Sequence, residues 1–196
     1  GDLSRCLAGI DAALAAGLRT KINVVVMRGV NDDEVGDFVR LARRRPVAVR
    51  FIEYMPSRGG ESEALTVPSE EVLARIAADA PLEPQPHEPG QALAGPARNY
   101  RLPGGAGTVG VISPVSEVFC AACNRIRVRA DGQARGCLFR DAAVDLRPLL
   151  RAGDQAGLAR TLRELIARKP ARHDLRPDGS RTDRGDDDLR MSRMGG

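Results

Sequence analysis

Three cysteines in a short stretch are the residues of this sequence best suited to metal chemistry. Cys120, Cys123 and Cys137 follow the spacing Cys-x2-Cys-x13-Cys, and the fourth cysteine, Cys6, lies far away in the chain. An odd trio does not fit a disulfide framework, whereas thiolates are ligands for zinc and for iron–sulfur clusters. The spacing therefore predicts a metal site in a reducing compartment.

The number of ligands leaves two kinds of metal centre open. A structural zinc site takes four protein ligands, so zinc would need Cys6, His87 or His173, and none of these has the customary finger spacing. A four-iron cluster anchored by three thiolates instead leaves one iron open to an exogenous ligand. The ligand count favours the open cluster, and a closed zinc site is the alternative.

Two arginines directly follow the first cysteine pair. Arg125 and Arg127 are two positions apart, so in a strand their side chains share one face. Forked guanidinium groups beside an open metal position suit a ligand with a polyphosphate tail. The alternative is a pair of surface arginines on an exposed hairpin.

The composition limits the partners of the chain. Lys21 and Lys169 are the only lysines among 30 basic residues; codon bias explains this as simply as an anionic ligand does. Aromatic residues make up 3% and tryptophan is absent, so stacking platforms for nucleic acid are scarce. No apolar run approaches the roughly 18 residues of a membrane span. We expect a cytoplasmic protein that binds neither nucleic acid nor membrane.

The first part of the chain alternates helices and strands. Helical periodicity over 3–14 precedes a β-branched strand over 21–27, and a second helix capped by Asn31-Asp-Asp33 precedes a strand over 47–54. Such alternation with short connections is typical of a parallel α/β fold. On the first helix Cys6 falls among apolar positions, which predicts a buried thiol.

Two strands do not form a stable sheet by themselves. We therefore expect residues 1–60 to be a fragment of a larger sheet or barrel, followed by a second domain over residues 61–196. Within 61–196 we expect a helix over 69–79 with a local cap at Ser69, short strands from about 99 and a last long helix over about 157–168. Asp131-Gly132 between two strand-like runs predicts a hairpin that returns Cys137 toward Cys123.

Polar residues on the two early strands form a second candidate site. Lys21 and Asn23 share one face of their strand, and Arg50 begins a stretch that ends with Glu53 and Met55. The C-terminal ends of strands carry the active sites of α/β barrels. This pattern indicates that the barrel remnant contributes to the site.

Several segments, in this order along the chain, resemble the C-terminal domain of the GTP 3′,8-cyclases, the radical S-adenosylmethionine (SAM) enzymes that open molybdenum cofactor biosynthesis. They are Lys21-Ile-Asn23, Gly29-Val-Asn-Asp-Asp-Glu34, Arg50-Phe-Ile-Glu-Tyr-Met-Pro56, Gly107-Thr-Val-Gly-Val-Ile-Ser-Pro114, Phe119-Cys-Ala-Ala-Cys-Asn-Arg-Ile-Arg127, Ala130-Asp-Gly132, Cys137-Leu-Phe139 and Gly195-Gly196. The resemblance is weak over 61–98 and 171–188.

The resemblance implies that residues 1–60 are the C-terminal remnant of an incomplete radical SAM (βα) barrel and that residues 61–196 are an α+β auxiliary-cluster domain. It also implies roles for individual residues. Cys120, Cys123 and Cys137 would hold an auxiliary [4Fe–4S] cluster that binds the guanine of GTP through its open iron. Arg125 and Arg127 would hold the triphosphate, with Lys21 and Arg50 as further GTP-side cations. The remaining roles are those of SAM-pocket residues (Asn23, Met55) and of a tail that reaches the active site (Gly195, Gly196).

The resemblance also implies an activity and partners. Such enzymes convert GTP to 3′,8-cyclo-7,8-dihydroguanosine triphosphate with a SAM-derived 5′-deoxyadenosyl radical. The family suggests a homodimer and a downstream cyclic pyranopterin monophosphate synthase that takes the product. The CxxxCxxC motif of the family does not occur in this sequence. We therefore expect a second [4Fe–4S] cluster on a preceding part, and this chain by itself to be inactive.

Two other functions are weighed against this one. A zinc-stabilised, arginine-rich module that binds nucleic acid would explain the cysteines and the charge, but it conflicts with the low aromatic content. Another radical SAM enzyme with an auxiliary cluster would usually contain more cysteines. The Asn-Arg-x-Arg run after Cys123 favours the cyclase.

Overall fold

A computed structural model describes residues 2–55, 63–86, 95–123, 125–138 and 143–173 of the chain. The chain divides into two compact units, one of residues 1–55 with 64–117 and one of residues 56–63 with 118–196. His87 and the glycine pair Gly195-Gly196 lie outside the described residues.

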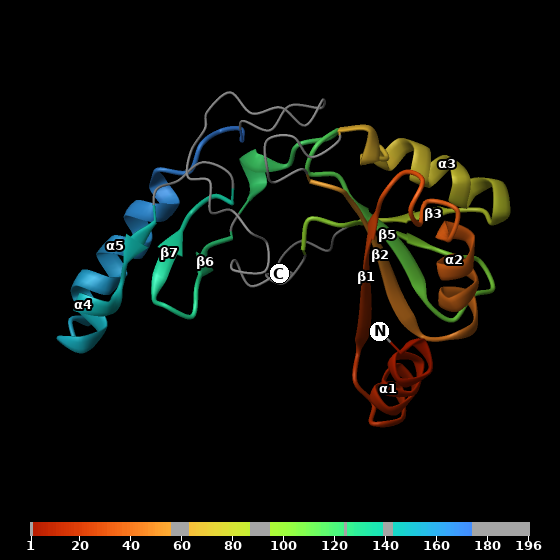
Figure 1. Cartoon of the computed structure of the whole chain (residues 1–196), viewed down its shortest axis with the longest axis horizontal. Coiled ribbons are helices and arrows are strands. Elements are labelled where there is room, and N and C mark those ends of the chain that lie inside the picture. Colours follow the sequence, from red (N-terminus) through yellow and green to blue (C-terminus); the bar gives the residue numbers. More distant parts are fainter. Residues whose placement is uncertain (1, 56–62, 87–94, 124, 139–142, 174–196) are drawn as a thin grey trace. The chain divides into compact units, whose positions relative to one another are not determined.

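The first unit is an α/β unit built on one five-stranded sheet (Figure 1). The strand order is β1-β2-β5-β4-β3; β1, β2 and β5 run parallel, and β4 and β3 are antiparallel to their neighbours. Its elements are α1 (Leu3–Ala15), β1 (Thr20–Val26), α2 (Val35–Arg44), β2 (Val47–Glu53), the 3-10 helix η1 (Glu63–Leu65), α3 (Ser69–Asp79), β3 (Glu83–Gln85), β4 (Arg98–Arg101) and β5 (Thr108–Ile112). The predicted helix–strand–helix–strand order and the parallel pairing are confirmed.

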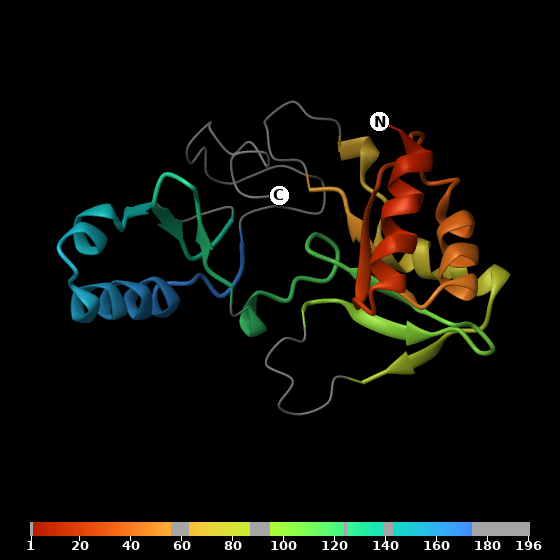
Figure 2. The ribbon, with the colours of Figure 1, turned by 90° about the horizontal axis from the view of Figure 1, so that it is seen from below.

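One face of this sheet carries the core of the unit. Alternate residues of β2, namely Val47, Val49 and Phe51, are buried and pack with the apolar sides of α2 and α3. Figure 2 shows these two helices beside the sheet. On the opposite face the intervening residues of β2 are only half-buried, and Val25 of β1 is 42% exposed. The sheet therefore has one packed face and one open face.

The first unit extends well past residue 60, where the sequence placed the start of the second domain. The apolar strand β5 pairs in parallel with β2, and β4 and β3 continue the same sheet, so the second unit resumes at Val118. Local periodicity places the strand-like runs after residue 98 in the later domain. It cannot show that these strands pair with distant strands of the first unit.

Two local expectations on the first unit are wrong. Cys6 is exposed rather than buried, because no residue of α1 is buried and the helix packs on the core only through Ile10 and Leu14. The predicted cap of the second helix is also absent: Glu34 precedes α2 and makes no side-chain capping bond. Asn31 instead accepts from the Met27 N–H over 2.8 Å, which closes the loop after β1.

The second unit is smaller and is built on the predicted hairpin. Its described elements are the 3-10 helix η2 (Cys120–Ala122), β6 (Arg127–Val128), β7 (Gln133–Arg135), β8 (Val144–Asp145), α4 (Arg147–Arg151) and α5 (Gln155–Ala167). Gly132 has φ = 79°, which lets the chain reverse between β6 and β7. Ala134, Leu146 and Leu165 form a small core between the sheet and α5.

None of the helices in the ranges given above has both the length and the apolar content needed to cross a membrane.

Candidate cluster and nucleotide site

The first cysteine pair lies on a short turn at the start of the second unit. Cys120 begins η2, and the Cys123 N–H donates to the Cys120 carbonyl over 3.0 Å. The backbone of Cys123 itself is extended, and β6 begins at Arg127. Cys120, Cys123 and Cys137 form no disulfide among the described residues, and all three are half-buried.

Cys123 has two hydrogen-bond donors at its sulfur. The Nζ of Lys169 lies 3.2 Å from Sγ, and the backbone N–H of Arg125 also donates to it. Burial raises the pKa of the Cys123 thiol, but these two bonds and the nearby positive charges lower it, and the net pKa lies below the ordinary value. A thiol with this environment favours the thiolate, which is the form that binds a metal.

The arginine pair lies beside the thiols. The Arg125 guanidinium lies over the Phe119 ring, 4.8 Å from its centroid. Burial and the charge of Arg125 lower the pKa of Arg127, while Cys123 and Cys137 partly oppose that change. Arg127 is thus close to two of the three cysteines, in a partly desolvated position where an anion would be bound strongly.

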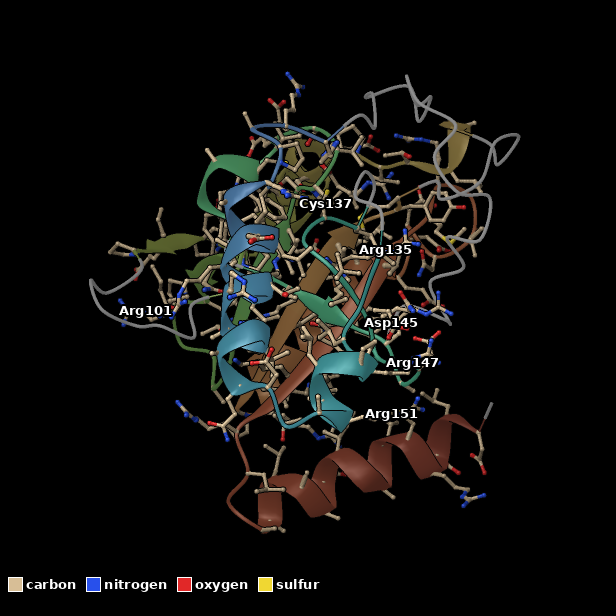
Figure 3. The ribbon with its side chains drawn as sticks, turned by 90° about the vertical axis from the view of Figure 1, so that its left-hand side faces the viewer. Arg101, Arg135, Cys137, Asp145, Arg147 and Arg151 are labelled. Carbon is tan, nitrogen blue, oxygen red and sulfur yellow. The ribbon has the colours of Figure 1, made fainter. Side chains whose placement is uncertain are left out.

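Arg135 was missed by the sequence reasoning. It lies directly opposite Arg127 in the hairpin and is 7% exposed. Like charges directly opposite each other destabilise a sheet. The arginine pair also adds to the positive potential of this unit. Figure 3 shows Cys137 just beyond the end of β7, which carries Arg135. The sequence contains a signal for this residue. After the turn at Gly132, residues 135 and 137 are two positions apart, so in an extended chain their side chains share one face.

The three thiols do not form a ready metal site. Across the ranges that the structure covers, no group of three or more His, Cys, Asp or Glu side chains is arranged to hold a metal ion. The hairpin pairing ends at Arg127 and Arg135, so no strand pair among the described residues fixes Cys137 against Cys123. The chemistry of the donor set fits an iron–sulfur cluster, because thiolates are the usual ligands of such clusters and Cys123 favours its thiolate.

The candidate residues of the first unit lie on the open face of the sheet or at its end. Lys21 and Asn23 are exposed on β1, and Asn23 pairs in register with half-buried Arg50 on β2. The Nε atom of Arg50 is buried and has no hydrogen-bond partner among the described residues. Half-buried Met55 lies two residues beyond the end of β2.

A polar row crosses this open face. Arg50 pairs in register with Gly110, which in turn pairs with Asn99, so the row runs from Asn23 through Arg50 and Gly110 to Asn99. A Cβ on Gly110 would lie 2.8 Å from the Oδ1 of Asn99, so a larger residue there would displace that amide. Asn99 is a further candidate that the sequence alone could not select, because its place in the row depends on pairing between distant strands.

Glu53 does not belong to the open face, although the sequence placed it near the site. Its side chain is 2% exposed and accepts the Ser69 N–H over 2.7 Å. Glu53 also accepts the N–H groups of Val115 and Ser116, each over 2.9 Å. The carboxylate therefore holds the end of β2, the start of α3 and the loop after β5 together.

The predicted site residues thus form two groups. Lys21, Asn23, Arg50 and Met55 belong to the first unit, and the cysteine trio with Arg125 and Arg127 belongs to the second. Gly195 and Gly196, predicted to reach the active site, lie outside the residues that the structure describes.

The fold and the site define an α/β protein whose second unit contains three cysteines together with several arginines. A family model described as Molybdenum Cofactor Synthesis C matches residues 47–175. The chain belongs to this family.

Curated relatives agree with the family. The chain is 53% identical to a GTP 3′,8-cyclase of Geobacter sulfurreducens, an alignment that covers 89% of the chain and 53% of the relative. It is 46% identical to a GTP 3′,8-cyclase of Moorella thermoacetica and 44% identical to one of Heliobacterium modesticaldum, and each alignment covers 100% of the chain and 59% of the relative. The chain therefore spans between half and three fifths of the length of these relatives.

Proposed function

We propose that this chain supplies the cluster-bearing and GTP-binding part of a GTP 3′,8-cyclase in molybdenum cofactor biosynthesis. The intact enzyme would convert GTP to 3′,8-cyclo-7,8-dihydroguanosine triphosphate by radical chemistry that SAM supplies. The observation that carries this proposal is the arginine pair beside the cysteines: Arg127 is close to both Cys123 and Cys137, and Arg125 precedes it on the same segment. The names of the relatives support the same activity.

Each residue of the second unit has a proposed role in this function. Cys120, Cys123 and Cys137 would hold a [4Fe–4S] cluster, which supplies an open iron for the guanine base. Arg125 and Arg127 would bind the triphosphate, because guanidinium groups match phosphate oxygens in pairs. The partial burial of Arg127 would strengthen its contact, since less water competes for the phosphate.

The first unit would complete the substrate site as a remnant of a radical SAM barrel. Lys21 and Arg50 would add positive charge toward GTP, and the unpartnered Nε of Arg50 is consistent with a missing anionic ligand. Asn23 and Met55 would line the SAM pocket, and Gly195 and Gly196 would complete the active site. A homodimer, a cytoplasmic location and transfer of the product to a cyclic pyranopterin monophosphate synthase belong to the same proposal.

The test is anaerobic reconstitution of the 196-residue chain with iron and sulfide and one-electron reduction of the cluster with dithionite, followed by electron paramagnetic resonance (EPR) and by titration with GTP. We expect a four-iron signal that changes when GTP is added. Stoichiometric tight zinc without a four-iron signal would overturn the cluster assignment and favour the zinc-stabilised alternative.

The same titration tests the arginines. Arg125→Ala and Arg127→Ala should each weaken GTP binding by about tenfold to a hundredfold, since a charge-assisted hydrogen bond contributes roughly 1.5–3 kcal/mol. Arg163→Ala is the matched control, because Arg163 is exposed on α5 of the same unit. Unchanged affinity in both test variants would remove them from the triphosphate site.

A further inference from the structure

Lys169 has an unusual place in this chain. It is one of two lysines among 30 basic residues, and the other, Lys21, is a candidate substrate ligand. Lys169 follows α5 directly after its last turn, where its N–H donates to the Ile166 carbonyl over 3.2 Å. The helix end therefore fixes the backbone from which the ammonium extends.

The ammonium of Lys169 holds two points of the cysteine segment. Its Nζ donates to the Sγ of Cys123 over 3.2 Å and to the carbonyl oxygen of Arg125 over 2.8 Å. Lys169 is 46 residues from Cys123 in sequence, so this contact joins the end of α5 to the segment that carries a predicted cluster ligand. The Arg125 side chain is held separately by Phe119.

A lysine suits this position better than an arginine. An ammonium group is a compact donor with three rotatable N–H bonds, so one atom can serve a sulfur and a carbonyl on different sides. A guanidinium directs its donors in one plane, and its fork matches carboxylates and phosphates rather than this pair of acceptors.

We propose that Lys169 is a positioning residue of the cluster site: it fixes the Cys123–Arg125 segment and donates an N–H···S bond to the Cys123 ligand. This inference rests on the proposed function only for the identity of the bound cluster. Hydrogen bonds to ligand sulfurs and nearby positive charge favour the reduced state of a cluster. Lys169 therefore both orders the ligand segment and raises the reduction potential.

The experiment compares the wild-type chain with Lys169→Met, Lys169→Arg and the control Arg168→Met. Arg168 is next to Lys169, but its side chain is 79% exposed and pairs only loosely with Glu164, at 4.0 Å. Thermal unfolding first shows which variants keep the fold. Hydrogen exchange of the Arg125 and Ile126 amides is then measured in the metal-free chain, and the midpoint potential is measured after reconstitution by EPR-monitored titration.

Lys169→Met should increase amide exchange at Arg125 severalfold and lower the potential by a roughly tenfold change in the reduction equilibrium, about 59 mV for one electron. Lys169→Arg should restore part of the potential but not the amide protection, and Arg168→Met should match the wild type. Loss of cluster uptake in Lys169→Met alone would also support the inference.

Unchanged exchange and unchanged potential in Lys169→Met would overturn the inference. The exchange arm needs no cluster, so the two failures can be told apart. If the wild type takes up no four-iron cluster, the proposed function fails, while the exchange result still decides whether Lys169 orders the segment. If the wild type binds the cluster and Lys169→Met behaves like it, only the role of Lys169 fails.

Discussion

The Ser69 N–H donates to the buried carboxylate of Glu53 over 2.7 Å, so a residue at the end of β2 caps the first turn of α3. The helix has no capping bond from Pro68, the residue that precedes it. A carboxylate near a helix N-terminus is also favoured by the helix dipole. Glu53 thereby couples the sheet, α3 and the loop that leads toward the second unit.

Replacing Glu53 should destabilise the first unit strongly. Glu53→Ala leaves the N–H groups of Ser69, Val115 and Ser116 without their acceptor, at a cost of about 1–3 kcal/mol for each one that stays buried and unpaired. Glu53→Gln keeps the shape of the side chain and one acceptor oxygen, so the free energy of unfolding should fall less. Urea denaturation measures both. A control on the exposed neighbour, Glu117→Gln, should change the free energy of unfolding little, and an Ala variant as stable as that control would refute the coupling.

Gly110→Ala should disrupt the polar row on the open face of the sheet. The new Cβ would lie 2.8 Å from the Oδ1 of Asn99 and 3.1 Å from the Arg98 carbonyl, so we expect a loss of about 1–3 kcal/mol. Asn99→Ala removes the closer contact and should recover part of that loss in the double variant, because neighbouring sites are not additive. Thermal unfolding of the two single variants and the double variant checks this. Strict additivity would show that Asn99 is not the obstacle.

The Asp145–Arg147 pair should make the free energy of unfolding depend on pH in the acid range (Figure 3). Hydrogen bonds from the Arg147 side chain and N–H lower the pKa of Asp145 from 3.8 to about 2. Because the folded pKa is depressed, this contribution is fully present above the unfolded pKa, about 3.9, and is lost as the pH falls through about 2. Arg147→Ala should move the Asp145 pKa, followed by NMR, back toward its usual value. An unchanged titration would exclude the pair as the cause.

A charged network should stabilise the loop after β1. The Arg75 Nη2 lies 2.9 Å from the Asp32 carboxylate and 2.8 Å from that of Glu71, which also binds Arg28. Arg75→Ala should lower the free energy of unfolding by about 1 kcal/mol, since the partly exposed charges are screened by solvent. The loss should shrink between about 0.1 M and 1 M salt. Arg40→Ala, which affects a single exposed pair with Asp37, is the control.

Phe119 should influence GTP affinity through Arg125. The ring supports the guanidinium at 4.8 Å, and an exposed cation–π contact contributes about 0.5–1 kcal/mol. Phe119→Leu should therefore weaken GTP binding by roughly twofold to fivefold while cluster uptake is unchanged. Isothermal titration of the reconstituted chain measures the difference. In an Arg125→Ala background the Phe119 change should have no further effect, and an equal effect there would point to a direct contact of Phe119 with GTP.

Local patterns in the sequence were sufficient for most elements. The 3.6-residue and two-residue periods predicted α1, α2, α3, α5 and the strands β1 and β2, because those periods reflect which side of one element is apolar. Asp131-Gly132 predicted the hairpin, since few residues adopt the positive φ that the turn requires. The five-residue helix α4 was missed, because one short turn leaves almost no periodic signal.

The sequence predicted the site residues that can be found from residue type and spacing. It missed those whose position depends on the pairing of strands. The sequence singled out the cysteine trio, Arg125 and Arg127, because their spacing and chemistry are local. Arg135 and Asn99 were missed, since their neighbours come from the register of other strands. The sequence also could not show that, among the described residues, the three thiols are not grouped as a metal site. Spacing along the chain does not give distances between sulfurs.

By itself the sequence determined the long helices, the hairpin and the chemical groups available for metal and phosphate. Only the tertiary structure decided that β5 completes the sheet of β2, that Glu53 caps α3 and that Lys169 bonds Cys123. The physical reason is common to all three. Each depends on a contact between residues 16 to 60 positions apart, such as Ile52 with Ile112, and such contacts depend on the packing of the whole unit rather than on local preference.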